Sequence, residues 1–197
     1  MTAAPSTVAA LATMKGNDMK TDTDVIANRE RADLLETLAK HRSFLRFTVK
    51  GLDDEQAGDH PTVSALCLGG LIKHVAEGES AWIDFILNGP AAMTRSFDEW
   101  TAESIADEWK SRFQMTPDES LSGLLEQYAE VARRTDEVVT GLADLDDGHP
   151  LPEAPWFEKG GHWSARRVIL HIIAETSQHA GHADIIRESL DGSKTMG

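Results

Sequence analysis

The sequence predicts an all-α protein, a four-helix bundle, and three observations carry that prediction. Four long segments repeat apolar residues at the period of a helix, most clearly at Leu121, Leu124, Leu125, Tyr128 and Val131. No stretch alternates polar and apolar residues as a half-buried strand would. Turn-forming residues separate the four segments, so each is expected to be a helix of its own. Helices with one apolar face bury those faces against one another, which favours a bundle.

We expect the four helices over residues 22–52, 63–88, 116–142 and 164–191. Thr116 and Ser164 stand where the third and fourth helices begin, because a hydroxyl there accepts a hydrogen bond from a backbone N–H of the first turn. Pro117 suits the first turn of the third helix. Gly89 and Gly192 are expected to end the second and fourth helices, since glycine readily adopts the left-handed conformation that follows a helix.

Two connections between the helices are long. Residues 90–118 join the second helix to the third, and we expect one short helix within them, over 97–113, with Phe113 on its inner side. Residues 143–163 are rich in Gly, Pro and acidic residues and have no regular period. Loops of that length are usually functional or mobile. Its aromatic residues either wall a pocket or hold the loop together: Trp156, Phe157, His162 and Trp163.

The chain length of 197 residues suits one domain with tails. Residues 1–22 are small, polar and without pattern, so we expect a disordered extension there. We place the domain at 23–192 and a short tail at 193–197. Met14 and Met19 are alternatives to Met1 as the true start.

Charge and cysteine content exclude several classes of function. The net charge of −14 argues against binding to nucleic acid or to anionic membranes, because both need basic patches. No apolar run approaches the roughly 20 residues of a membrane span, and the N-terminus makes a poor signal peptide. Cys67, the single cysteine, excludes an intramolecular disulfide and is expected to be a buried thiol. These observations favour a cytoplasmic protein.

Four polar side chains share one face of the last helix. His171, Glu175, His179 and His182 are spaced by four, four and three residues, which places them within roughly 80° of arc. The rest of that helix is apolar, so these groups need partners when they are buried. A divalent cation is a partner for two or three of them at once. We therefore predict a metal site on this face.

The helical rise limits which of these groups can share one ion. His171 and His179 lie about 12 Å apart along the axis, which is too far. Neighbours one turn apart can converge, and geometry alone leaves three pairs open: Glu175 with His179, His179 with His182, and His171 with Glu175.

Two other helices also carry histidines on their apolar faces. His74 lies on the stripe of the second helix, and Gly78, one turn away, leaves room near it for another group. His41 lies on the stripe of the first helix, where it is either a core histidine, which we expect, or a residue that approaches the site. Glu77 and Glu79 are expected to face solvent.

Two segments resemble the DinB/YfiT-like superfamily of metal-dependent four-helix-bundle proteins: LCLGGLIKHVAEGESAW at 66–82 and WSARRVILHIIAETSQHAGHADIIRESLDG at 163–192. The nearest similarity is to its actinobacterial branch, which is similar to mycothiol-dependent maleylpyruvate isomerase and related thiol S-transferases. The resemblance covers about residues 25–192. It implies an up-down-down-up bundle, and the long 88–118 connection suits two adjacent parallel helices.

The resemblance also implies the metal ligands. Members of the family place one histidine on the second helix and a His-x-x-x-His or Glu-x-x-x-His pair on the fourth, which here implies His74, Glu175 and His179. Two imidazoles and one carboxylate leave a divalent ion with a net positive charge and an open position. We expect Zn²⁺, while Ni²⁺ and Fe²⁺ also suit these donors. His182 and His171 are then expected as catalytic base or as residues that orient the ligands.

The function implied is a metal-dependent thiol S-transferase, with mycothiol as co-substrate. A cationic site with an open position holds a thiol as thiolate, which then attacks a small electrophile. Two alternatives stay open: a metal-binding, stress-associated module without catalysis, and a metal-dependent hydrolase using the same residues. The expected partners are a small thiol and an electrophile, and a homodimer is compatible with the sequence.

Overall fold

A computed structural model of the chain describes residues 22–93, 107, 110–154 and 157–195. Four long helices lie side by side along its length: α1 (Asp22–Phe47), α3 (Leu68–Asn88), α5 (Leu121–Gly141) and α6 (Ala165–Asp191). Short elements join them: α2 (Asp54–Gly58), the 3-10 helix η1 (Gly89–Met93), β1 (Gly148–Pro150) and β2 (His162–Ser164). The predicted four-helix bundle is confirmed. The disorder expected over 1–22 and most of the short helix expected over 97–113 lie outside the described residues.

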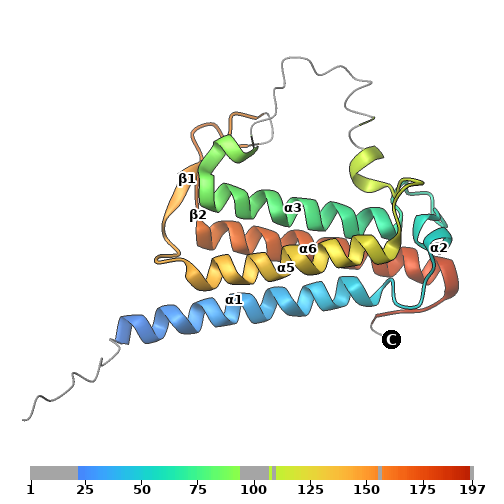
Figure 1. Cartoon of the computed structure of the whole chain (residues 1–197), viewed down its shortest axis with the longest axis horizontal. Coiled ribbons are helices and arrows are strands. Elements are labelled where there is room, and N and C mark those ends of the chain that lie inside the picture. Colours follow the sequence, from blue (N-terminus) through green and yellow to red (C-terminus); the bar gives the residue numbers. More distant parts are fainter. Residues whose placement is uncertain (1–21, 94–106, 108–109, 155–156, 196–197) are drawn as a thin grey trace, which may run out of the picture.

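The helix directions match the up-down-down-up arrangement. In Figure 1, α1 and α6 run one way, whereas α3 and α5 run the other way. The parallel helices α3 and α5 contact each other and are joined by the long connection, while α1 packs mainly on α6 and α3 also packs on α6. The seam between α3 and α6 therefore brings together the two helices that resemble the metal-dependent superfamily.

Two helices begin later than their sequence patterns predict. Helix α3 begins at Leu68, not at 63 or 64, because Cys67 is its N-cap residue and Sγ accepts the Gly70 N–H at 3.4 Å. Helix α5 begins at Leu121 with Ser120 as N-cap, so Thr116 and Pro117 lie in the preceding turn. Apolar residues ahead of Leu68 explain the early start expected for α3. For α5, Thr116 and Pro117 suit a helix start but lie in a turn in which the Glu119 N–H donates to the Thr116 carbonyl at 3.0 Å.

The expected ends of α6 are confirmed, whereas α1 and the 143–163 loop differ. Ser164 caps α6, and Gly192 ends it with φ of 78°. Helix α1 ends at Phe47, five residues short of the expectation. The sequence predicted no strands, and this prediction is wrong. Strands β1 and β2 pair antiparallel, with Gly148 opposite Ser164. Strands of three residues are too short to show an alternating pattern.

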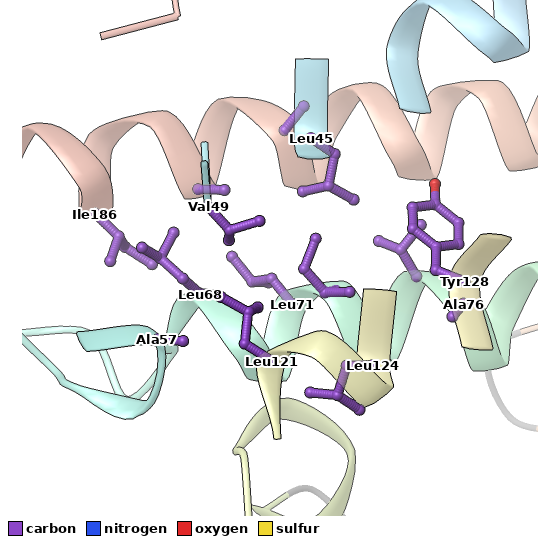
Figure 2. Close-up of a cluster of buried hydrophobic side chains, with 14 residues drawn as sticks. Leu45, Val49, Ala57, Leu68, Leu71, Ala76, Leu121, Leu124, Tyr128 and Ile186 are labelled. Carbon is purple, nitrogen blue, oxygen red and sulfur yellow. The ribbon is translucent and has the colours of Figure 1, made fainter. Parts of the chain in front are cut away.

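The interior is filled from all four helices. Figure 2 shows Leu45 of α1, Leu71 of α3, Leu124 of α5 and Ile186 of α6 converging on one buried cluster. Each of these residues is at most 4% exposed. Cys67 is completely buried, as expected. His41, expected in the core, is only half-buried and places its ring edge against Phe44 at 6.0 Å.

An ion pair crosses the core and corrects the expectation for Glu79. Glu79 is 2% exposed rather than solvated, and Arg42 is 4% exposed. The Arg42 guanidinium donates through Nε to Glu79 Oε2 at 3.1 Å and through Nη2 to Oε1, while Nη1 donates to Asp136 at 2.8 Å. Thr135 donates its hydroxyl hydrogen to Glu79 Oε1 at 2.6 Å. This network ties α1, α3 and α5 together.

Within the described part of the chain, no helix combines the length and apolar character needed to cross a membrane.

Candidate metal centre

Three potential metal donors meet where α3 passes α6. His74 comes from α3, while Glu175 and His179 come from successive turns of α6. One donor atom from each residue lies within 4.8 Å of the other two. The His74 and His179 rings meet edge to face, with centroids 4.8 Å apart, and His179 Nε2 lies 3.5 Å from Glu175 Oε2. The structure therefore brings together the three residues that the resemblance implied.

Burial and neighbouring charges set the protonation of these donors. Burial lowers the pKa of His74 to about 4, and electrostatic repulsion from His179 and Arg112 acts in the same direction. The hydrogen bond from His179 lowers the pKa of Glu175, although burial opposes it. At neutral pH the site therefore presents a neutral imidazole and an ionised carboxylate, which are the forms that bind metals.

The donor set fits a divalent ion. Ligands at about 2.0–2.2 Å from one ion lie no more than roughly 4.4 Å apart, and the three donors here are already within 4.8 Å. One carboxylate and two neutral imidazoles would leave a net charge of about +1 on a divalent ion. The sites of borderline metals such as zinc commonly combine these donors.

Phe113 covers His74 and was not identified as a site residue from the sequence. Its ring stacks on the His74 ring, with centroids 4.0 Å apart and planes inclined by 29°. Gly70 permits this packing, because a Cβ there would lie 1.9 Å from the Phe113 carbonyl oxygen. The thiol of Cys67 also points at this oxygen, at 3.9 Å. The end of the long connection is therefore held against α3, where it limits the freedom of the His74 ring.

The two histidines expected to assist the ligands occupy different surroundings. His182 Nδ1 lies 3.5 Å from His179 Nδ1, the ring nitrogen opposite to the one that faces Glu175. His171 lies one turn before Glu175 on α6, where its charge also lowers the Glu175 pKa, and its ring meets Trp82 and Trp163 edge to face at 4.9 and 5.0 Å. Burial lowers the pKa of His171. Their roles as catalytic base or orienting residue stay predictions.

The aromatic residues of the 143–163 loop form a cluster on α3. Trp163 stacks on Trp82 at 4.9 Å, and Phe157 meets the edge of the same ring at 6.0 Å. These contacts support the interpretation that aromatic residues hold the loop in place. His162 is exposed, and Trp156 lies outside the described residues.

The lowered pKa of His74 predicts a pH-dependent stability for the metal-free protein. In the unfolded chain a histidine takes up a proton near pH 6.5, whereas folded His74 does so only near pH 4. Between these values the unfolded chain binds more protons, so the free energy of unfolding falls as the pH falls. Urea unfolding of the metal-free protein at pH 7, 6 and 5 measures this loss.

His74→Gln is expected to reduce that loss, because the titrating group is removed. The exposed His60 provides a matched control, and His60→Gln is expected to keep the wild-type dependence on pH. An equal loss of stability in wild type and His74→Gln would show that His74 does not titrate in this way.

Comparison with known proteins supports the fold. The chain is similar to YfiT from Bacillus subtilis, described as a probable metal-dependent hydrolase with an unusual four-helix bundle topology, at 14% identity and a TM-score of 0.59 over 91% of this chain and 94% of that one. It is also similar to a conserved protein from Enterococcus faecalis, at 13% identity and a TM-score of 0.58 over 81% of this chain and 96% of that one. None of the curated proteins compared with the sequence matches it.

A family model described as mycothiol-S-transferase matches residues 33–192. The match includes His74, Glu175 and His179 and spans all the long helices apart from the beginning of α1. Together with the fold shared with YfiT, it confirms the resemblance to the DinB/YfiT-like superfamily. The chain belongs to the mycothiol-S-transferase family.

Proposed function

We propose that this protein is a metal-dependent thiol S-transferase that uses mycothiol as its thiol and transfers it to a small electrophile. The observation that carries the proposal is the meeting of His74, Glu175 and His179 between α3 and α6, inside the region that the family model matches. Zinc is the preferred ion for these donors, and nickel or iron(II) also suits them. A cytoplasmic location, where small thiols are kept reduced, is part of the proposal.

A divalent ion bound by these residues would supply a cationic position at which a thiol is held as thiolate near neutral pH. The protein's own residues prepare that position. Glu175 contributes the one negative charge among the three donors, so the site keeps attraction for an anionic sulfur. Phe113 stacks on His74 and restricts its ring, while His182 contacts the nitrogen of His179 that points away from Glu175.

The sulfur must come from a second molecule. The chain has one cysteine, and Cys67 is completely buried with its thiol turned toward Gly70 N and the Phe113 carbonyl. It caps a helix and is not available for reaction with a substrate. A transferase at this site would therefore depend on a soluble thiol, which agrees with the family description.

A metal-dependent hydrolase is the second candidate, and the position of His182 favours it. A half-buried imidazole next to a ligand can accept a proton from an attacking water. YfiT, which shares the fold, is described as a probable hydrolase.

The test follows the loss of free thiol when zinc-loaded protein is mixed with mycothiol and a panel of electrophiles. Consumption above the uncatalysed rate is expected with the loaded protein, and its loss with metal-stripped protein and with His179→Ala. The exposed-residue variant His60→Ala should retain the wild-type rate. Equal rates with and without metal would refute the proposal.

Two further outcomes point to the alternatives. Metal-dependent ester or amide cleavage without any thiol requirement would support the hydrolase. Fully loaded protein that turns over no substrate in either assay would support the metal-binding module.

A further inference from the structure

In the described part of the chain, a position on the seam between α3 and α6 is left unfilled between the metal centre and an aromatic cluster. His74 contacts His179, and eight residues further along α3, Trp82 contacts His171, eight residues back along α6. The two helices therefore keep one antiparallel register between these contacts. In that register, Gly78 lies opposite Glu175, one helical turn from each pair of rings.

The described residues leave free space above Gly78. A Cβ built on Gly78 would have no atom of the described residues within 4 Å, although the glycine is half-buried. Gly70, on the same helix, differs, because the Phe113 backbone packs directly on it. Close packing therefore explains why position 70 is a glycine, but it does not explain the glycine at position 78. A glycine inside a helix destabilises it relative to alanine, and the described residues offer no packing contact at Gly78 that would offset this cost.

The surroundings of this space indicate what can occupy it. The register set by the two ring contacts places Glu175, one of the three metal donors, across from Gly78, so the metal centre lies toward one end of this space. The other end is formed by Trp82 and His171, whose rings meet edge to face at 4.9 Å. Aromatic side chains favour contact with other flat π systems. The space is only as wide as the side chain that Gly78 lacks and lies between two packed helices, so a flat molecule fits it more readily than a branched one.

Resting on the transferase function proposed above, we propose that the space over Gly78 seats the electrophile, and that this electrophile is a small planar aromatic or conjugated molecule. Gly78 is then a residue that sets substrate size. With an aryl halide, the thiolate sulfur forms a bond to the ring carbon, and the halide leaves with the electron pair of the broken carbon–halogen bond. The thiol proton passes to solvent, so the step needs no oxidant or reductant.

A binding experiment tests the seat without requiring turnover. 2,4-Dinitrotoluene, a planar and unreactive analogue of an aryl halide, is titrated into zinc-loaded protein without thiol, following the quenching of tryptophan fluorescence. Saturable binding is expected for wild type. Gly78→Leu is expected to weaken it at least tenfold, because the side chain fills the space, with zinc content unchanged.

Gly181 provides the matched control, since it is an exposed glycine inside α6 whose Cβ would also meet no described atom within 4 Å. Gly181→Leu should bind the analogue as wild type does. If Gly78→Leu fails to fold, Gly78→Ala replaces it, because alanine favours the helix and should still weaken binding measurably. Unchanged affinity in the Gly78 variants, or no saturable binding to wild type, would overturn the seat.

Turnover separates this inference from the proposed function. With 1-chloro-2,4-dinitrobenzene and thiol, Gly78→Leu should lose at least tenfold in rate while the smaller, non-aromatic iodoacetamide keeps its rate. An equal change with both electrophiles would contradict selection of a planar substrate. If the protein binds the analogue in a way that depends on Gly78 but has no transferase activity, the proposed transferase function is wrong and the proposed binding site over Gly78 is supported.

Discussion

Changing His74 or His179 to alanine is expected to lower bound zinc from about one ion per chain to less than about a tenth of that. The reason is that each residue supplies one of the three donors that the described residues bring together, and the two histidines come from different helices. The measurement is elemental analysis of zinc-loaded protein after exhaustive dialysis. His60 is exposed, so the His60→Ala variant tests whether removal of any histidine lowers the bound zinc.

The competing assignments of the donors give distinct results in the same experiment. Undiminished zinc content in both His74→Ala and His179→Ala would show that these residues do not form the zinc site. Loss of zinc in His182→Ala with retention in Glu175→Ala would show that the pair on α6 is His179 with His182, which lie 3.5 Å apart at Nδ1.

The second large effect is expected in the core, where Glu79→Ala should lower the free energy of unfolding by about 3–5 kcal/mol. The substitution leaves the guanidinium of Arg42, which is 4% exposed, without its buried counter-charge. Thr135 also loses its acceptor. Urea unfolding monitored by circular dichroism measures the change.

Two comparisons identify the cause of this loss. Glu130→Ala removes an exposed ion pair with Arg133 and should leave the unfolding midpoint unchanged. Replacing both Arg42 and Glu79 by apolar residues of similar volume should recover much of the stability, because no charge then stays buried alone. If Glu79→Ala is as stable as wild type, the ion pair contributes nothing to the fold.

The long helices could be predicted because their signals are local and repeated. The leucines of α5 recur on one face, and Ser164 and Gly192 mark the ends of α6 as expected. The start of α3 was misplaced because apolar residues continue before it and because the cap is a thiol, Cys67. A cysteine is not among the residues that usually cap helices.

The burial of Glu79 and the position of Phe113 over His74 depend on contacts with residues distant in the chain, which the sequence does not reveal. Glu79 follows a glycine and precedes a serine, which is typical of an exposed position, and its partner Arg42 lies 37 residues away. Phe113 could be placed on an inner face but not over His74, because that contact depends on the backbone packing against Gly70.

The metal donors also differ in how far the sequence alone predicts them. Their spacing placed Glu175 and His179 on one face of α6, since that depends only on helical geometry. His74 is implied as the third donor by the family resemblance alone, because spacing within one helix says nothing about which helix lies beside it. The ring contact between His74 and His179 supplies that missing information.

Anomalous diffraction from crystals of the zinc-loaded protein, measured on both sides of the zinc absorption edge, tests the metal centre most directly. We predict one zinc peak between α3 and α6, about 2.0–2.2 Å from a ring nitrogen of His74, from His179 Nε2 and from a carboxylate oxygen of Glu175. A zinc ion bound at a position that excludes His74, or one held by His182 in place of Glu175, would contradict the account.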